Sequence, residues 1–268
     1  MERTFHFFHY KQAILHYSIY GTGSKPLFCF HGFGLDGSYF YELEKHLATD
    51  YTIYNFDLFF HGKSEWKDGD KRITKEFLAA LIGEFNKEKN ISTFSLLGYS
   101  IGARLVWTIV EAFPDKVKEI TVAAPDGITT RFWYGIATGS VITRNIFRLL
   151  LSHKRNSSIL FSIGKFFHLA PSLVLRFAES QLQTPEQRNR VYKTWVTFRK
   201  LKADPKALAE QINHYNIQLT IYLGKHDKII TYKNVKPLVE KVEKKKVITL
   251  EAGHSNLIQK ISFFNSTI

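Results

Sequence analysis

Residues 98–102 read Gly-Tyr-Ser-Ile-Gly and place Ser100 between two glycines. The apolar run Phe-Ser-Leu-Leu at 94–97 precedes them, and residues 103–110 follow with the apolar spacing of a buried helix. A G-x-S-x-G stretch between a strand and a helix is typical of a sharp turn that holds the serine hydroxyl in an exposed corner. Glycines suit such a turn because backbone segments approach too closely for a Cβ. We therefore predict that Ser100 is a nucleophile at a strand–helix elbow.

The length and cysteine content limit the class of protein. A chain of 268 residues can form one α/β domain with a substantial insertion. The single cysteine, Cys29, excludes an internal disulfide and lies in an apolar run, so we expect a buried thiol. No secretory signal and no stretch of roughly 20 apolar residues is evident. We expect a cytoplasmic protein without stable membrane insertion, acting as a monomer or a homodimer.

The formal net charge of +13 indicates a basic surface. A solvated, lysine-rich surface is the simplest explanation of this charge. A more specific alternative is that the charge attracts an anionic substrate or a membrane surface. No nucleic-acid-binding motif accompanies the charge, so we expect no nucleic-acid partner. The expected partner is a small-molecule substrate.

Strand-like runs alternate with helical patterns on either side of a long helical segment. This alternation predicts a mostly parallel central sheet with helices on both faces. Helical patterns occupy residues 38–47, 73–87 and the segment after Ser100. The predicted strands are residues 4–9, 14–20, 26–30, 51–56, 91–97, 117–124, 219–223 and 247–250.

The alternation is interrupted between residues 128 and 216 by helix-like segments rich in aromatic residues. Thr184-Pro185 and Asp204-Pro205 are each typical of a helix start, with an N-cap residue followed by proline. We therefore predict a core of residues 1–127 and 217–268, and an all-helical cap of residues 128–216 inserted after the sixth strand. Some cap aromatics are expected to face the substrate.

Two later loops offer partners for Ser100. Asp227 follows the predicted strand 219–223, and His254 follows the predicted strand 247–250. A serine needs an adjacent base that is itself oriented by an acid. The carboxyl ends of parallel strands share one edge of a sheet, so these loops can meet there. Among the other aspartates, Asp126 is an alternative acid, after the preceding strand, and Asp204 fits a helix N-cap.

These motifs together resemble those of the α/β-hydrolase superfamily, over nearly the full chain. The order serine, aspartate, histidine is that of this fold. The matching stretches are His31-Gly32-Phe33-Gly34, Asp57 with His61-Gly62-Lys63-Ser64, Gly98 to Gly102, Gly224 to Asp227, and Gly253-His254.

The resemblance implies a role for each matching residue. Ser100 is the nucleophile, His254 the general base and then acid, and Asp227 the carboxylate that orients His254. The backbone N–H groups of Phe33 and Ile101 form the oxyanion hole. His31 is expected to brace its loop.

Four further residues are candidates for substrate binding. Phe59 and Phe60 occupy positions where the superfamily commonly has Pro-Gly, so we expect their loop to take a different path. We expect the two rings either to line the pocket or to pack in the core. Tyr99 and Arg104 flank the elbow in a stretch that resembles the menaquinone-pathway lyase of the same superfamily, in which an arginine at this spacing helps to bind carboxylates.

The sequence thus favours a serine hydrolase that cleaves an ester, thioester or amide of a small, largely apolar substrate through an acyl-enzyme. Such acyl transfer needs no cofactor, and no metal-ligand cluster or dinucleotide fingerprint is present. One alternative is a C–C bond hydrolase or lyase of the same superfamily acting on an anionic substrate. Another, of a different class, is a ligand-binding receptor that retains the triad.

Overall fold

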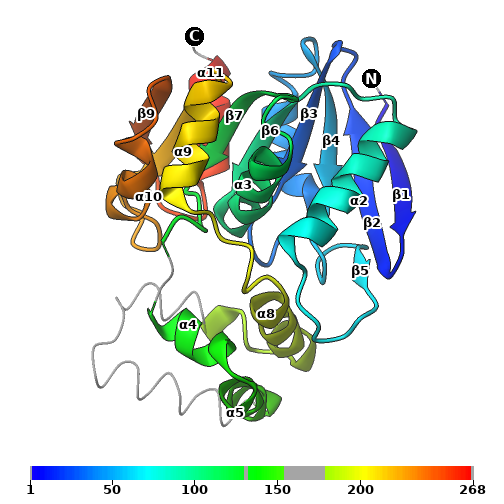
Figure 1. Ribbon diagram of the computed structural model, residues 1–268, viewed down its shortest axis with the longest axis vertical. Coiled ribbons are helices and arrows are strands. Elements are labelled where there is room, and N and C mark those ends of the chain that lie inside the picture. The colour runs from blue at the N-terminus through cyan, green and yellow to red at the C-terminus, as the bar shows by residue number, and fades with distance from the viewer. Residues whose placement is uncertain (1, 130–131, 154–178, 267–268) are drawn as a thin grey trace. The chain divides into compact units, whose positions relative to one another are not determined.

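The computed structural model describes residues 2–129, 132–153 and 179–266 (Figure 1). Its strands form one sheet in the order β1-β2-β4-β3-β6-β7-β8-β9, with β5 paired to β2. The strands are β1 (Thr4–Tyr10), β2 (Ala13–Tyr20), β3 (Lys25–Phe30), β4 (Tyr51–Phe56), β5 (Glu65–Trp66), β6 (Phe94–Tyr99), β7 (Val117–Ala123), β8 (Gln218–Gly224) and β9 (Lys245–Leu250).

The sheet is parallel from β4 to β9 and antiparallel at its β1–β2 side. Strands β3, β4, β6, β7, β8 and β9 pair in parallel, whereas β2 pairs antiparallel with β1, β4 and β5. The predicted mostly parallel sheet is therefore confirmed. Parallel strands end at one edge, so the loops after β3, β6, β7, β8 and β9 can supply residues to a common site.

Helices α2, α3 and α9 lie in front of the sheet in Figure 1, and α1 contacts α11. The helices packed with the sheet are α1 (Tyr41–Glu44), α2 (Lys75–Glu88), α3 (Ala103–Ala112), α9 (Pro205–His214), α10 (Tyr232–Val239) and α11 (Leu257–Ser266). Short 3-10 turns η1 (Gly37–Phe40) and η2 (Ser100–Gly102) precede α1 and α3. The other helices of the described residues are α4 (Phe132–Gly139), α5 (Val141–Ser152) and α8 (Pro185–Thr197).

The chain divides into two compact units. The first contains Met1–Lys67, Thr74–Thr129 and Leu201–Ile268, and the second contains Asp68–Ile73 and Thr130–Lys200. The second unit contains residues 130–200 of the segment 128–216 that is expected to form a cap, and of these 130–131 and 154–178 lie outside the described residues. Residues 201–216 group with the sheet instead, because α9 contacts both α3 and α10.

The described part of the second unit has an aromatic centre. The ring of Phe147 in α5 stacks on Trp195 in α8, with 5.5 Å between centroids. Tyr134 in α4 packs its ring at 5.3 Å from Trp195 and donates its hydroxyl to the Trp195 carbonyl at 2.9 Å. These contacts join the three helices around one apolar cluster.

Several segments differ from the sequence-based expectation, among them β5 and α11, which were not predicted. Instead of one helix over residues 38–47, the chain forms η1, the single turn α1 and further turns closed by i to i+3 bonds, such as Leu47 N–H to the Glu44 carbonyl. Helix α10 was not predicted, because Pro237 interrupts its pattern. Its N-terminus is nevertheless capped through Asn234, whose side chain accepts from the Thr231 N–H at 2.9 Å.

Two smaller expectations are met. Asp204 caps α9, since its carboxylate accepts from the N–H groups of Lys206 and Ala207 at 2.8 and 3.1 Å. Those bonds lower the pKa of the Asp204 carboxyl. Cys29 is buried in β3, and burial raises the pKa of its thiol. The thiol thus belongs to the core.

Candidate active site

Ser100 lies at the turn between β6 and α3. Its φ is +51°, a left-handed conformation that is strained for a residue other than glycine. A Cβ on Gly98 would stand 2.7 Å from Cγ2 of Val106, and one on Gly102 would stand 2.1 Å from the Phe30 carbonyl oxygen. Both flanking glycines are therefore required by close packing, and the stretch has the expected strand–turn–helix form.

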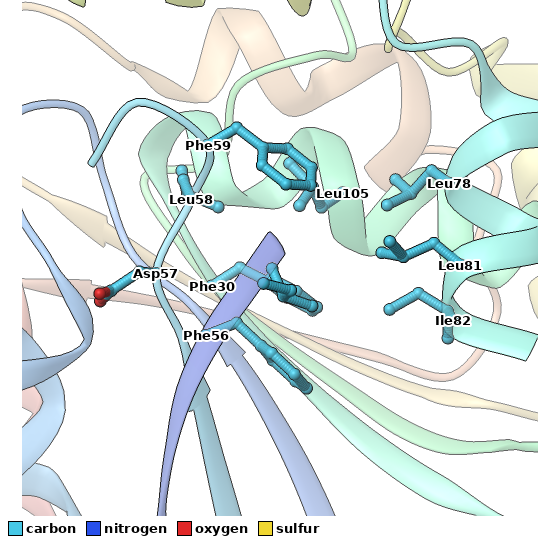
Figure 2. A pocket seen from close by; sticks show the side chains of 10 residues that line it. Phe30, Phe56, Asp57, Leu58, Phe59, Leu78, Leu81, Ile82 and Leu105 are labelled. Atoms are coloured by element: carbon cyan, nitrogen blue, oxygen red, sulfur yellow. The ribbon is translucent and has the colours of Figure 1, made fainter. Parts of the chain in front are cut away.

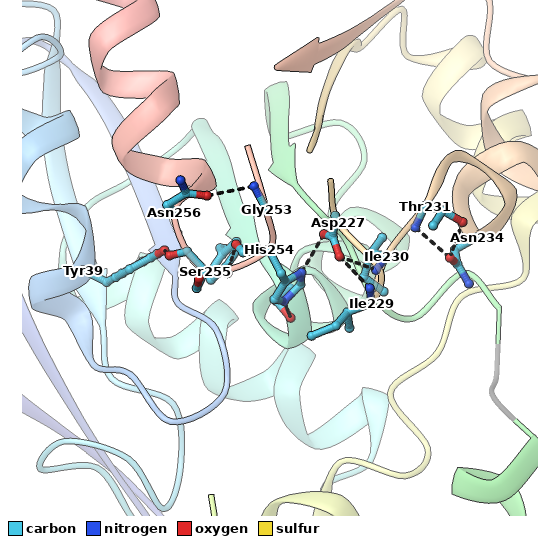
Figure 3. A network of polar contacts seen from close by, with 12 residues as sticks. Tyr39, Asp227, Ile229, Ile230, Thr231, Asn234, Gly253, His254, Ser255 and Asn256 are labelled. Atoms are coloured by element: carbon cyan, nitrogen blue, oxygen red, sulfur yellow. Dashed lines mark hydrogen bonds and ion pairs between the residues drawn. The ribbon is translucent and has the colours of Figure 1, made fainter. Parts of the chain in front are cut away.

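Ser100, His254 and Asp227 are joined by hydrogen bonds. The Ser100 hydroxyl lies 3.0 Å from Nε2 of His254, and Nδ1 of His254 lies 2.7 Å from Oδ2 of Asp227 (Figure 3 shows the latter bond). Asp227 comes from the loop after β8, and His254 comes from the loop after β9. A carboxylate at Nδ1 favours the tautomer with its proton there, which leaves Nε2 to accept the serine proton.

The Asp227 carboxylate is completely buried and fixed by the main chain. Its side chain has an exposed fraction of 0%. Its Oδ1 accepts from the N–H groups of Ile229 and Ile230 at 2.6 and 2.9 Å, so Oδ2 is the oxygen that faces His254 (Figure 3). The loop thus orients the carboxylate before any substrate binds.

Asp126, the alternative acid, has a different set of partners. Its Oδ2 accepts from Nε of Arg104 at 2.7 Å, and its carbonyl accepts from the Trp107 indole N–H at 3.0 Å. Its own N–H donates to the Ser100 carbonyl at 3.0 Å. Asp126 therefore contacts the elbow through the Ser100 main chain and the side chains of α3, while Asp227 is the carboxylate that binds the imidazole.

Phe33 and Ile101, the candidate oxyanion residues, follow neighbouring strands. Ile101 comes directly after Ser100 in η2, and Phe33 lies in the loop after β3. Strands β3 and β6 are paired in parallel with Phe30 opposite Gly98, so the two loops start side by side. This is the arrangement in which two main-chain N–H groups can converge on one oxygen.

His31 braces the loop that carries Phe33. It is fully buried, and its Nδ1 donates to the Gly32 carbonyl at 2.7 Å. Its Nε2 accepts from the Leu58 N–H at 2.9 Å, which links this loop to the one after β4. With both nitrogens bonded to main chain, His31 has the structural role expected for it.

Phe59 is buried, and the contacts present in the structure are those of the second placement expected for it, packing in the core. Its ring packs 5.7 Å from Trp66, and its exposed fraction is 2%. It borders a closed apolar void of about 10 Å³ between the sheet and the helices (Figure 2). The void is also lined by Leu15, Phe30, Phe56, Asp57, Leu58, Leu78, Leu81, Ile82 and Leu105.

Phe60 is half-buried and has φ of +68°. This left-handed conformation is the one that glycine, the usual residue of the superfamily at this position, adopts without strain. The loop therefore makes a glycine-like turn despite the loss of Pro-Gly. Such a conformation costs a non-glycine residue about 1–2 kcal/mol.

Tyr99 and Arg104, the other two candidates, are engaged within the chain. The exposed fractions are 3% for Tyr99 and 5% for Arg104. The Tyr99 hydroxyl donates to the His254 carbonyl at 2.6 Å, and Arg104 forms its ion pair with Asp126. Both side chains are therefore held by partners within the chain, and their roles in substrate binding stay predictions.

Sequence reasoning missed Tyr39, which lies in η1. Its hydroxyl donates to the Ser255 carbonyl at 2.5 Å, and its ring stacks on Tyr99 with 5.1 Å between centroids. These partners are 216 and 60 positions away, and nothing local to Tyr39 indicates the contact. Only the assembled fold brings it to the site.

Within residues 2–129, 132–153 and 179–266, no group of three or more His, Cys, Asp or Glu side chains is arranged to hold a metal ion. In the same part of the chain, every helix is too short or too polar to cross a bilayer.

Comparison with known proteins supports the fold. A family model described as alpha/beta hydrolase fold matches residues 25–261. No curated protein matches the chain in sequence.

Similar solved structures include a serine hydrolase from the polyaromatic-hydrocarbon-degrading bacterium Cycloclasticus zankles, with a TM-score of 0.69, 15% identity and coverage of 99% of this chain and 96% of that one. They also include the thioesterase domain from the curacin biosynthetic pathway, with a TM-score of 0.68, 17% identity and coverage of 100% of this chain and 99% of that one. An esterase from Thermogutta terrifontis has a TM-score of 0.68, 13% identity and coverage of 95% of this chain and 91% of that one. At these identities the structures show a common fold. With the family model covering most of its length, the chain belongs to the α/β-hydrolase fold family.

Proposed function

We propose that this protein is a serine hydrolase that cleaves an ester, or a thioester or amide, of a small and largely apolar substrate. The observation that carries the proposal is the unbroken hydrogen-bond chain from Ser100 through His254 to the buried Asp227. The esterase and thioesterase named among the similar structures support an ester-type bond. The aromatic composition of residues 128–216 supports an apolar substrate, and we propose that this segment is the specificity cap.

In the proposed cycle, Ser100 Oγ attacks the substrate carbonyl while its proton passes to Nε2 of His254. The resulting oxyanion accepts hydrogen bonds from the N–H groups of Phe33 and Ile101. When the tetrahedral intermediate collapses, the bond to the leaving group breaks and His254 returns the proton to it. The acyl group is then bound to Ser100.

Deacylation repeats these steps with water as the nucleophile. His254 removes a proton from water, the hydroxide attacks the acyl carbonyl, and the proton then goes to Ser100 Oγ as the acid product leaves. Asp227 stays ionised throughout, holding the imidazole in the reactive tautomer and stabilising the imidazolium. All four proton transfers of the cycle pass through His254, and Ser100 carries the acyl group between its two halves.

The lyase alternative is less well supported, because it needs Arg104 to bind a substrate carboxylate. Arg104 instead pairs with Asp126 at 2.7 Å. A receptor would bind its ligand without turning it over, so an assay of turnover distinguishes it from the proposed hydrolase. A panel of p-nitrophenyl esters with acyl chains of increasing length should show turnover that depends on Ser100 and His254. Binding of these esters without turnover would favour the receptor.

A further inference from the structure

Two tyrosines hold the loop that carries His254, residues 251–256, hereafter the His254 loop. Tyr99 donates its hydroxyl to the His254 carbonyl at 2.6 Å, and Tyr39 donates to the Ser255 carbonyl at 2.5 Å (Figure 3 shows the Tyr39 bond). We propose that Tyr99 and Tyr39 are positioning residues that keep the His254 imidazole in register with Ser100. This inference rests on the serine-hydrolase function proposed above.

The His254 loop needs such ties because its position decides the Ser100–His254 contact. The loop connects β9 to α11, and within it the Gly253 N–H donates to the Asn256 side chain at 2.9 Å (Figure 3). The two hydroxyls bind successive carbonyls and so fix the two peptide planes that follow His254. Nε2 of the imidazole must reach Ser100 Oγ and then the leaving group, and shifts of about 1 Å can be costly to such transfers.

The tie through Tyr99 is direct, because Tyr99 is the residue before Ser100. One side chain thus links the main chain of the proposed nucleophile to the main chain of the proposed base. The ring of Tyr99 also lies 5.3 Å from the His254 ring. A displacement of the His254 loop would therefore have to break the Tyr99 bond or disturb the elbow itself.

The ring of Tyr99 is fixed from two sides. A Cβ on Gly32 would stand 2.7 Å from Cδ1 and Cε1 of Tyr99, so the absence of a side chain at Gly32 makes room for the ring. The ring of Tyr39 stacks on it at 5.1 Å with 25° between the planes. Tyr39 is carried by η1, whose N-cap Asp36 accepts from the Ser38 N–H at 2.9 Å. The two donors are thus preorganised.

Both phenols remain donors over the working pH range. Burial raises the pKa of Tyr99, and the neighbouring Tyr39 and Asp227 raise it further. Burial also raises the pKa of Tyr39. Because both pKa values lie above the ordinary value of about 10, loss of activity from ionisation of either tyrosine is not expected below that pH.

The test compares Tyr99→Phe, Tyr39→Phe and the double variant with wild type. Each change removes one hydroxyl and keeps the ring. A matched control is Tyr51→Phe, which removes the hydroxyl bound to Glu119 at the first residue of β4, away from the carboxyl ends of the strands. The readouts are the rate of labelling by a fluorophosphonate, kcat and KM for a p-nitrophenyl ester, and hydrogen exchange in the His254 loop.

We expect about a fivefold lower labelling rate and kcat in each single variant, the size of one net hydrogen bond, with KM unchanged. The double variant should lose more than the product of the two, because each single variant retains the other tie to the same loop. Hydrogen exchange in the His254 loop should become faster in these variants. Tyr51→Phe should leave all three readouts as in wild type.

The outcomes separate this inference from the function on which it rests. Wild-type labelling rates in the double variant, with labelling lost in Ser100→Ala, would overturn the positioning role and leave the serine hydrolase intact. A rise in KM with unchanged kcat would also overturn it, because it would assign the tyrosines to substrate binding. A wild-type protein that does not label at all would overturn the proposed function, and the positioning role with it.

Discussion

The exchange Asp227→Asn tests the acid of the proposed triad most sharply. Oδ1 of Asp227 accepts from the N–H groups of Ile229 and Ile230, so an asparagine must place its carbonyl oxygen there to keep both bonds. Its NH₂ group then faces Nδ1 of His254 at the present 2.7 Å contact. The imidazole is forced to accept at Nδ1 and to carry its proton on Nε2, which can no longer receive the Ser100 proton.

The expected loss follows from this wrong tautomer. In the serine-protease triad that serves as the general template, the corresponding exchange lowers kcat by about 10⁴. We expect a loss of about 10³ to 10⁴ in kcat here, or about 4–5.5 kcal/mol of transition-state stabilisation. The assay is steady-state hydrolysis of a p-nitrophenyl ester, with urea unfolding to show that the variant is folded.

Asp126→Asn is the matched control for this exchange. Asp126 contacts Arg104 and the main chain of Ser100, so the control should lower stability while leaving kcat within about tenfold of wild type. The reasoning would be refuted by near-wild-type kcat in Asp227→Asn together with abolished activity in Asp126→Asn.

Four further predictions concern other parts of the chain. Gly102→Ala should lower the free energy of unfolding by about 1–3 kcal/mol in urea, because its Cβ would overlap main chain. Gly135→Ala should not, because a Cβ there would have no atom of the described residues within 4 Å, and equal effects would contradict the packing argument. The Asp204 pKa is lowered in the folded state, so its carboxylate stabilises above the unfolded pKa of about 4 and this contribution is lost as pH falls through the lower folded pKa. The stability difference between wild type and Asp204→Asn should therefore shrink from pH 6 toward pH 2, and a constant difference would count against it. Phe59→Leu should reduce stability and leave KM unchanged, whereas a large change in KM would place this residue in the substrate site. Cys29 should resist a thiol reagent in the native protein and react after unfolding in guanidinium, and rapid native reaction would contradict its burial.

The sheet and the order of the candidate residues were predictable because both depend on local patterns. Apolar runs bounded by glycine indicated the strands, and Ser100, Asp227 and His254 each follow such a run. Parallel strands then bring the following loops to one edge, which is why residues up to 154 positions apart are hydrogen-bonded. The placement of the three candidate residues could thus be predicted from their positions after the ends of strands.

What the sequence did not predict depends on tertiary contacts. The sequence shows Arg104 as a cation beside the elbow, but it does not show that Arg104 is buried and paired with Asp126. Tyr39 has no motif of its own. Helix α10 could not be predicted because Pro237 interrupts its helical pattern. Its buried Leu238 and Val239 pack it against the core. In each case packing, not local preference, decides the outcome.

The measurement that tests the central proposal most directly is covalent labelling of the folded protein by a fluorophosphonate, followed by peptide mass spectrometry. A single adduct on Ser100 is expected, with no adduct in Ser100→Ala and much slower labelling in His254→Ala, because the hydroxyl is activated only through the imidazole. Absence of an adduct on the folded wild-type protein, or an adduct that persists in Ser100→Ala, would contradict the proposal that Ser100 is the nucleophile.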